Sequence, residues 1–312
     1  MIFIPVNFPD LVTMAVPAKY RLSIVTLNFN RLYESRYTIE KLLEMCADRA
    51  DIEIIAVDNN SKDGTAEFLR SQEGVQEILL STNDGIAGYN VGFEKAAGEF
   101  ILVLDDDSCP ADSETLDLLI TTLRDNPEIG VVACHIETPE GNPQWKWHLP
   151  HDRQIGVSPF FIGCGFAIRR ELFERIEWYP GNFFIYQNEI DVSFKVRQEG
   201  FEIVYHPLCR VIHRGVPSTR PGWRCVYYPT RNTIWLIKKY YPQPLAAYML
   251  MSRILIGFGR ALYLRQLPSF YKALRDAYAE PVKKSILSRE IRSVTRPFWR
   301  QNSIFHHLLG RT

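Results

Sequence analysis

The sequence predicts an α/β protein, with a Rossmann-like, mostly parallel sheet flanked by helices and a C-terminal helical extension. From Arg21 onward, short apolar runs alternate with amphipathic stretches, and that rhythm is typical of a sheet covered by helices. The apolar runs are short and rich in β-branched residues, as in strands that are buried on both faces. At 312 residues with 46% hydrophobic content, the chain can bury a large core.

Five strands and four helices are expected in the first half of the chain. The strands are Leu22–Leu27, Ile52–Val57, Glu77–Leu80, Phe100–Leu104 and Ile129–Cys134. The helices have helical spacing and begin near Asp, Ser, Thr or Gly: Tyr37–Cys46, Thr65–Ser71, Ala87–Ala97 and Glu114–Arg124.

The second half has a different rhythm. Thr138–Pro159 contains Pro and Trp and is expected to be a loop over the site, followed by the strand-like run FFIGCGFAIRR. A helix over Asn188–Glu199 and extended segments at Glu202–Tyr205 and Cys209–His213 come next. We therefore expect an N-terminal extension at 1–20, a catalytic domain at 21–220 and a helical, membrane-associating region at 221–312.

Composition argues against several classes of protein. Lys+Arg equals Asp+Glu at 36 each, so a nucleic-acid partner is not expected. The six cysteines form no CxxC pair and are expected to be reduced core residues. The first residues lack a signal-peptide pattern, and Leu245–Phe258, with Arg253 inside it, is too short to span a membrane. These features predict a cytoplasmic protein that can lie at the cytoplasmic face of a membrane.

Three adjacent carboxylates, Asp105, Asp106 and Asp107, follow the predicted strand Phe100–Leu104. Adjacent carboxylates repel unless a positive charge lies between them, and Mg²⁺ or Mn²⁺ would supply it. Solvated acids in a polar turn are the alternative. His213 ends another apolar run and can add an imidazole nitrogen to such a metal site, although a lone histidine is usually structural.

Polar residues also follow the other strands. Asn28, Asp58 and the aspartates would meet in one crevice, because ligands of open α/β sheets bind beyond the carboxyl ends of the strands. Asp58 is expected to contact a nucleobase or ribose, with turn formation and helix capping as the alternative. The glycine-rich run from Thr82 to Gly92 permits close approach to a ligand, yet it matches neither a P-loop nor a dinucleotide fingerprint.

Two acids, Glu189 and Asp191, stand at the start of the helix predicted at Asn188–Glu199. One of them can act as the general base that deprotonates an acceptor hydroxyl, and helix capping is the alternative. Trp145 and Trp147 in the central loop can offer a platform for a sugar ring, or pack in the core. Together with Gly163 they are the residues expected on the acceptor side.

Taken together, these segments resemble the family 2 inverting glycosyltransferases of the GT-A fold, especially the rhamnosyl- and galactofuranosyltransferases. The resemblance covers roughly Leu22 to Arg214. It is carried by LSIVTLNFNR, AVDNNSKDGT, TNDGIAGYNVGF, ILVLDDDSCP, FFIGCGFAIRRELF and FFIYQNEIDVSFKVRQEGFEIVYHP followed by VIH. Each motif alone is weak, whereas their order and spacing together are specific.

The resemblance implies a set of site residues. The donor, a UDP- or dTDP-sugar, is expected to contact Thr26, Asn28, Asp58, Asn83, Gly85, Asn90, Asp105 and Asp106. Asp105 and Asp107 fill the family's DxD positions, and His213 matches the histidine that often completes the metal site. Glu189 is the expected base, but Asn188 replaces the usual first acid of the pair, so Asp191 stays as an alternative.

The resemblance also implies the reaction. An acceptor hydroxyl displaces the nucleoside diphosphate in one step with inversion, and the triple aspartate favours a galactofuranosyl over a rhamnosyl donor. The QxxRW motif of processive synthases is absent, so addition of one sugar is expected. The basic, aromatic C-terminal stretch suggests peripheral membrane contact with lipid-linked glycan acceptors, or a packed appendage or dimer contact. A nucleotidyltransferase and an inactive nucleotide-sugar-binding scaffold are the other functions considered.

Overall fold

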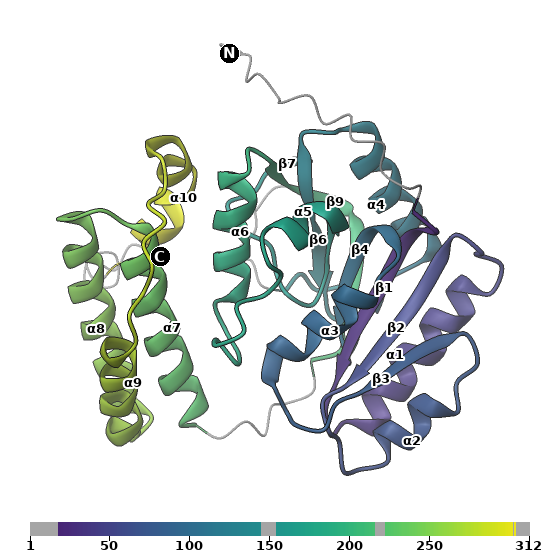
Figure 1. Ribbon diagram of the computed structural model, residues 1–312, viewed down its shortest axis with the longest axis horizontal. Helices are drawn as coiled ribbons and strands as arrows, with labels where there is room; N and C mark the ends of the chain where they lie inside the picture. Colours follow the sequence, from purple (N-terminus) through teal and green to yellow (C-terminus); the bar gives the residue numbers. More distant parts are fainter. Residues whose placement is uncertain (1–17, 145–153, 216–221, 302, 304–312) are drawn as a thin grey trace.

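The computed structural model describes residues 18–144, 154–215, 222–301 and 303 of the chain. Within these residues the core is a nine-stranded sheet with the strand order β3-β2-β1-β4-β8-β6-β9-β5, and β7 pairs with β9 (Figure 1). The strands are β1 Tyr20–Asn28, β2 Ile52–Asp58, β3 Val75–Leu79, β4 Gly98–Asp105, β5 Ser108–Pro110, β6 Ile129–Glu137, β7 Gly156–Val157, β8 Phe166–Arg169 and β9 Glu202–His213.

The four strands from β3 to β4 are parallel, and their order sets the position of the site. The chain runs from β1 outward to β2 and β3, and then returns past both to form β4 on the other side of β1. The direction of strand addition therefore reverses at β1. In open α/β sheets, such a switch point between neighbouring strands opens a crevice at their carboxyl ends, which is where ligands bind.

The other half of the sheet is mixed. Strand β8 lies antiparallel between β4 and β6, whereas β9 runs parallel to β6 and antiparallel to the short β5. The predicted α/β class is confirmed, and the antiparallel β8 lies within the predicted strand-like run FFIGCGFAIRR, whereas the structure adds the short strands β5 and β7. Strand β9 is continuous over the two segments predicted separately, with a register irregularity between Cys134 and His135 of its neighbour β6.

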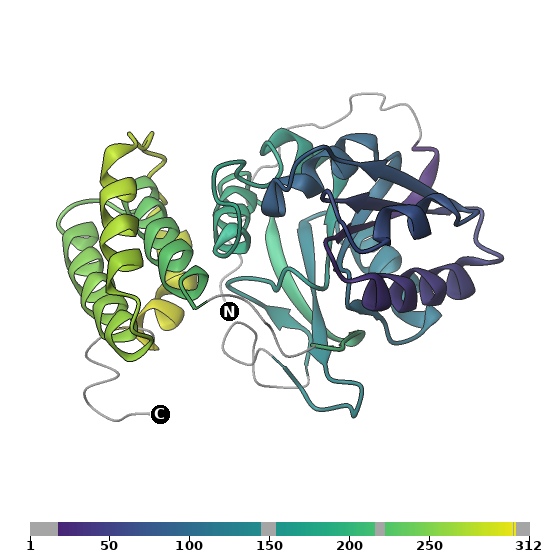
Figure 2. The ribbon, with the colours of Figure 1, turned by 90° about the horizontal axis from the view of Figure 1, so that it is seen from below.

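Helices cover both faces of the sheet (Figure 2). The helices of the catalytic region are α1 Leu32–Cys46, α2 Thr65–Arg70, α3 Gly88–Lys95, α4 Ser113–Asp125, α5 Arg170–Arg175 and α6 Asn188–Gln198, and a 3₁₀ turn, η1 Gly85–Ala87, precedes α3. Helix α1 begins five residues earlier than predicted, because Asp63 accepts a hydrogen bond from the Leu32 N–H at 2.8 Å.

Four C-terminal helices lie beside α6, on its side away from β1 to β3 (Figure 1). They are α7 Arg224–Tyr240, α8 Leu245–Tyr263, α9 Leu267–Ala279 and α10 Arg289–Gln301. They share a second hydrophobic cluster with the catalytic region, in which Phe160 and Phe194 pack with Tyr240 and Phe298.

Helix α8 differs from the expectation for this region. It contains 19 residues, and by length and composition it is apolar enough to cross a membrane. The 14-residue stretch expected from the sequence therefore underestimates the length of this helix. Arg253 does not interrupt the helix, because its guanidinium lies against the Trp299 ring of α10.

Candidate active site

The carboxyl ends of β1, β2 and β4 bring three predicted site residues together. Asn28 is in register with Asp58, and Leu27, directly before Asn28, is in register with Asp105. Neighbouring strands lie about 4.8 Å apart. The three side chains therefore border one edge of the sheet at the switch point, as the sequence predicted.

Two buried oxygens mark the part of the site where a nucleoside would bind. Asn28 donates to Thr26 Oγ1 at 3.2 Å and to the Val57 carbonyl at 3.1 Å, while Asp58 Oδ2 accepts from the Ser61 N–H at 2.9 Å. The remaining oxygens, Asn28 Oδ1 and Asp58 Oδ1, are buried and have no hydrogen-bond partner. Because a buried acceptor without a donor is costly, the pair fits a ligand that brings N–H or O–H groups.

The glycine-rich run is held in place by Asn59, which is buried. Its amide nitrogen donates to Asn83 Oδ1 at 3.1 Å and to the Gly85 carbonyl at 2.9 Å, and its oxygen accepts from the Asp84 N–H at 2.9 Å. Asn83 Oδ1 also accepts from the Gly85 N–H at 3.0 Å. Asn59 and Asn83 thereby fix the loop beside Asp58.

Gly85 is required by a close approach of two backbones. It has φ +61°, and a Cβ atom there would lie 2.1 Å from the Phe184 carbonyl oxygen. The next residue, Ile86, donates its N–H to that oxygen at 2.7 Å. The glycine-rich run therefore contacts the segment that leads into α6.

Asn90, expected at the donor, has another role in the structure. Its amide nitrogen donates to the Tyr179 carbonyl at 3.0 Å, and its oxygen accepts from the Tyr179 N–H at 3.2 Å. Both ends of the amide are thus used to join α3 to the segment before α6. Its contact with a donor stays a prediction.

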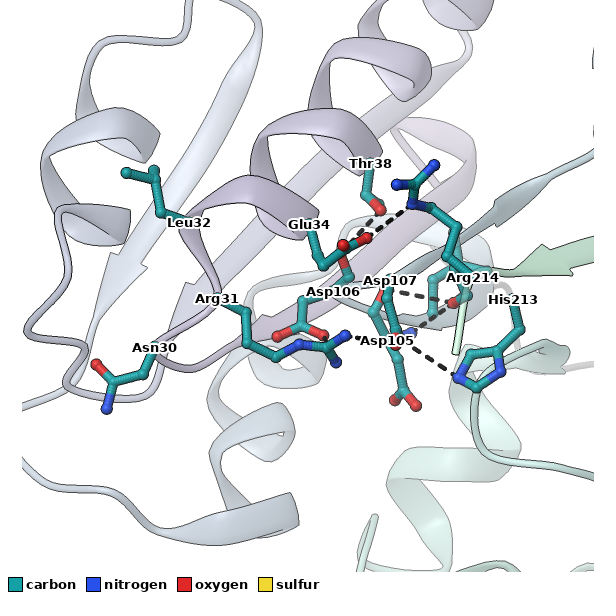
Figure 3. Close-up of polar contacts among 12 residues, drawn as sticks. Asn30, Arg31, Leu32, Glu34, Thr38, Asp105, Asp106, Asp107, His213 and Arg214 are labelled. Carbon is teal, nitrogen blue, oxygen red and sulfur yellow. Dashed lines mark hydrogen bonds and ion pairs between the residues drawn. The ribbon is translucent and has the colours of Figure 1, made fainter. Parts of the chain in front are cut away.

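The three aspartates have different environments, and Arg31 is the reason (Figure 3). Its guanidinium bridges Asp106 Oδ1 and Asp107 Oδ2, each at 2.8 Å. An arginine from the β1–α1 connection therefore already lies between two of the three acids, so a divalent ion would not have to balance all of them. Asp106 is enclosed beneath α1, where Thr38 donates to its carbonyl at 2.9 Å, so the arginine and not a ligand is its partner.

Burial and neighbouring charges separate the pKa values of these acids. Burial, reinforced by the charges of Asp107 and Asp105, outweighs Arg31 and raises the pKa of Asp106 to about 8. Burial acts in the same direction on Asp107, but His213 and Arg31 outweigh it and lower its pKa to about 2. Asp107 is therefore the acid that stays ionised.

The pairing of β5 with β9 places His213 at this cluster. His213 is opposite Ser108, and its Nε2 lies 3.4 Å from Asp107 Oδ1. Gln144 holds the other side of the ring, because its Oε1 lies 3.0 Å from Nδ1 and its amide donates to the His213 carbonyl. Gln144 Oε1 can accept a hydrogen bond from the Nδ1–H, which leaves Nε2 facing the site, where a metal would replace the proton that it shares with Asp107.

These donors fit a divalent cation. Ligand atoms of Asp105, His213 and Cys164 lie within 4.8 Å of one another, and Asp107 Oδ1 is buried without a well-formed hydrogen bond. Carboxylate and imidazole donors suit Mn²⁺ and Mg²⁺ better than a thiol does. Burial raises the pKa of Cys164 well above its usual value, which keeps the thiol protonated and favours the oxygen and nitrogen ligands.

Glu189 occupies the start of α6, close to Gly163. The Gly163 N–H hydrogen-bonds the Glu189 carboxylate, and a Cβ atom at Gly163 would lie 2.7 Å from its Oε1. Desolvation by the surrounding protein, together with the charge of Asp105, raises the pKa of Glu189 to about 7. Gly163 was expected on the acceptor side, and the structure places it against the predicted base.

Asp191, the alternative base, is a structural anchor. Its Oδ1 accepts from Lys239 Nζ at 2.8 Å and from the Tyr240 hydroxyl at 2.7 Å, and Lys195 Nζ lies 3.2 Å from its Oδ2. Burial opposes ionisation, but the two lysines outweigh it and lower the pKa of Asp191. A fully buried, ionised and multiply bound carboxylate cannot readily take a proton from an acceptor.

The segment before α6 is held in an unusual backbone conformation by α7. Phe184, Tyr186 and Gln187 all have φ between 61° and 70°. Asn232, fully buried on α7, donates to the carbonyls of Phe183, Ile185 and Tyr186 at 2.9 to 3.1 Å. Helix α7 thus positions the loop that leads into α6 and Glu189. Trp145 and Trp147 lie outside the described residues.

The family model named "Glycosyl transferase family 2" matches residues 23–191, and this segment contains every expected donor residue together with Glu189. The chain belongs to this family. The predicted family and the predicted enzyme class, a glycosyltransferase, are thereby confirmed.

Curated relatives of this family 2 chain include the O-antigen biosynthesis protein RfbC of Myxococcus xanthus, which is 24% identical over 69% of the chain. The probable glycosyltransferase YdaM of Bacillus subtilis is 21% identical over 72% of it. The chain spans 18% of the length of RfbC and 57% of YdaM.

Solved structures share the fold of this family 2 chain at low sequence identity. GalNAc-T7 with UDP, GalNAc and Mn²⁺ has a TM-score of 0.62 at 16% identity, over 95% of this chain and 58% of that one. The mannosyltransferase PcManGT from Pyrobaculum calidifontis, in complex with GDP-Man and Mn²⁺, has a TM-score of 0.57 at 17% identity, over 96% and 92%. The predicted GT-A fold is confirmed.

Sequence reasoning missed four positioning residues of this family 2 site. Arg31 and Asn59 stand within the quoted motifs, directly after the first strand and the second, and their position was a usable signal. Gln144 and Asn232 lie in a loop and in a helix without a motif. Their roles follow from tertiary contacts alone.

Proposed function

We propose that the chain is a metal-dependent, inverting glycosyltransferase that moves one sugar from a nucleoside diphosphate sugar onto an acceptor hydroxyl. The observation that carries the proposal is the meeting of three groups at one sheet edge. These are the two buried acceptor oxygens of Asn28 and Asp58, the Asp105, Asp107 and His213 donors, and the Glu189 carboxylate beside Gly163.

Each group has a task in this reaction. Asn28 and Asp58 receive hydrogen bonds from the nucleoside and orient it, and Asn59 fixes the glycine-rich loop against it. Asp105, Asp107 and His213 would hold the divalent ion, which neutralises the leaving diphosphate when bound. The Mn²⁺ named with both GalNAc-T7 and PcManGT supports this metal class.

Glu189 is the proposed general base. It takes the proton of the acceptor hydroxyl while that oxygen forms a bond to the anomeric carbon, and the bond from this carbon to the diphosphate oxygen breaks. The configuration at the anomeric carbon is inverted, and the proton ends on Glu189. A pKa of about 7 suits this role, because the group is then partly ionised at neutral pH and basic enough to accept a proton.

The names of similar proteins bear on the identity of the donor and the acceptor. UDP is named with GalNAc-T7, and UDP-GlcNAc with TarS of S. aureus, at a TM-score of 0.59. These names favour a UDP-sugar, such as UDP-galactofuranose, over a dTDP-sugar such as dTDP-rhamnose. The similarity to an O-antigen biosynthesis protein favours a glycan or lipid-linked glycan acceptor in cell-surface polysaccharide synthesis, at the cytoplasmic face of the membrane.

A donor screen tests the proposal. Full-length protein with Mn²⁺ or Mg²⁺ is given single UDP-, dTDP- and GDP-sugars with and without glycan acceptors, and donor binding and diphosphate release are measured separately. We expect release with one donor, loss of release on chelation, and a fall of about 10²- to 10⁴-fold in Glu189→Gln with donor binding retained. Binding without release by the wild type under all conditions would favour an inactive scaffold, and release of pyrophosphate from a nucleoside triphosphate would favour a nucleotidyltransferase.

A further inference from the structure

A pocket lies far from the sheet edge, between α8 and α10. It has a volume of about 510 Å³, and five arginines line it: Arg253 of α8 and Arg289, Arg292, Arg296 and Arg300 of α10. Tyr241 and Trp299 contribute aromatic surface to the same pocket. Among the described residues that line it, none is acidic.

These arginines differ from those that are paired with acids elsewhere in the molecule. Arg31, Arg49, Arg210 and Arg214 all lie within 3 Å of a carboxylate oxygen. In the part of the chain that the structure describes, none of the five pocket arginines forms an ion pair with a carboxylate, and the Arg253 guanidinium lies 5.1 Å from the centroid of the Trp299 ring. Burial lowers the pKa of Arg253 to about 10, which leaves it charged at neutral pH. Five clustered cations without an acid are complementary to a multiply charged anion.

An exposed apolar stripe begins at the pocket and runs along α8. Tyr248 lines the pocket and is the first residue of a stripe that continues with Met251, Leu255, Phe258 and Leu262, at intervals of three or four residues. Such spacing places them on one face of the helix. Met251 is 55% exposed and Leu262 is 51% exposed. The opposite face is already used, because the buried Ala246, Met249 and Ala261 belong to hydrophobic clusters with residues of α7 and α9.

We propose that the pocket binds the phosphate headgroup of an anionic membrane phospholipid, with the acyl chains along the stripe of α8. The arginines provide charge and paired donors for phosphate oxygens, and the stripe provides the apolar contact that free phosphate does not need. Because α8 packs on α7 and α9 through its other face, it lies along the membrane surface instead of crossing it. This inference is independent of the proposed transferase activity.

Vesicle binding tests the inference with the full-length protein. Sedimentation is compared for vesicles of phosphatidylcholine alone and of phosphatidylcholine mixed with phosphatidylglycerol, using the wild type, the double variant Arg292→Gln/Arg296→Gln and the control Arg260→Gln. Arg260 is an exposed arginine on α8 that does not line the pocket. We expect the double variant to lose about tenfold or more of its affinity for phosphatidylglycerol vesicles, whereas Arg260→Gln loses much less. Equal losses in both, or equal binding to the two vesicle types, would overturn the headgroup site.

A thermal shift separates lipid from free phosphate. A short-chain phosphatidylglycerol below its micelle concentration is expected to raise the Tm of the wild type and not that of the double variant, and inorganic phosphate at the same concentration is expected to have no effect. An equal shift with inorganic phosphate would mean that the pocket binds free phosphate, and the lipid proposal would be wrong. Near-wild-type circular dichroism of the double variant excludes a loss of fold as the cause.

Discussion

At the scale of single residues, the surroundings of Glu189 set the pH at which the enzyme can work. A general base is active when deprotonated, and the pKa of Glu189 is raised to about 7, so turnover should rise as the pH increases through about 7. Asp105 contributes to that shift, and a cation bound at Asp105 would move the midpoint lower. When donor and metal are saturating, a plot of the rate of nucleoside diphosphate release against pH should show one ionisation on its acidic side. A flat profile, or a Glu189→Gln variant with wild-type turnover, would remove Glu189 from this role.

Gly163 allows a prediction that separates activity from stability. In Gly163→Ala the new Cβ would lie 2.7 Å from Glu189 Oε1, and the flexible carboxylate can move aside at little cost to the fold. We expect kcat to fall by roughly tenfold or more from the displaced base, while the free energy of unfolding changes by less than about 1 kcal/mol. Gly156→Ala is the matched control, because no atom lies within 4 Å of its Cβ position. Full activity in Gly163→Ala would show that this contact does not position the base.

Arg31 should matter for stability as well as for the site. Its removal leaves the buried carboxylates of Asp106 and Asp107 without their shared cation, and the side chain is 30% exposed. We expect Arg31→Gln to lower the free energy of unfolding by about 1–3 kcal/mol, as measured by denaturant titration. Arg36→Gln, which breaks an exposed pair with Glu40, should change it by less than about 0.5 kcal/mol. Equal effects would mean that Arg31 is no more than a surface charge.

At the scale of secondary structure elements, α7 supports the loop that leads into α6. Asn232→Ala removes three hydrogen bonds to the carbonyls of Phe183, Ile185 and Tyr186, in a loop with positive φ values. We expect a loss of about 2–4 kcal/mol in the free energy of unfolding, with kcat falling more than donor affinity because Glu189 follows this loop. Cys225→Ala on the same helix is the control, and equal kcat in both variants would contradict the coupling.

Local pattern predicted the parallel strands well and the mixed half of the sheet less well. Strands β1, β2, β4 and β6 were found from their β-branched runs, because strands buried on both faces are apolar throughout. The three-residue β5 is too short for periodicity to identify, whereas the four-residue β8 lies within the predicted strand-like run FFIGCGFAIRR. Helix α8 continues to Tyr263, past the apolar stretch that was predicted to end at Phe258, and Arg253 inside it is accommodated by tertiary contact with Trp299.

At the scale of the whole molecule, the helical region and the catalytic region are expected to fold together. Phe194 and Asp191 of the catalytic region lie against Tyr240, Tyr241 and Lys239 of α7 and its C-terminal end, and Phe160 packs against Phe298 of α10. A chain ending at residue 220 would expose this apolar surface and leave the buried Asp191 without two of its partners. We expect that truncated chain to aggregate or to unfold at much lower denaturant concentration than the full chain. A soluble fragment with an unchanged midpoint would instead show two independent domains.

Site residues at the ends of strands could be predicted from the sequence. Residues whose roles depend on tertiary contacts could not. Asn28, Asp58 and Asp105 were found because strand ends meet at the switch point, and His213 because it ends β9. The roles of Asp106, Asn90 and Asp191 depend on partners 48 to 89 residues away, which local pattern does not reveal. Gln144 and Asn232 were missed for the same reason.

The ion pair between Glu34 and Arg214 joins residues 180 positions apart, and Arg214 also donates its N–H to the Asp107 carbonyl. During synthesis on the ribosome, the parallel strands β1 to β4 emerge long before the segment that carries His213 and Arg214. The early half of the sheet can pair while the metal-binding cluster is still incomplete. The active site is therefore expected to assemble late in biogenesis, when β9 docks beside β6. A nascent chain that stalls before residue 213 would have the strand ends of β1 and β2 in place but would lack His213.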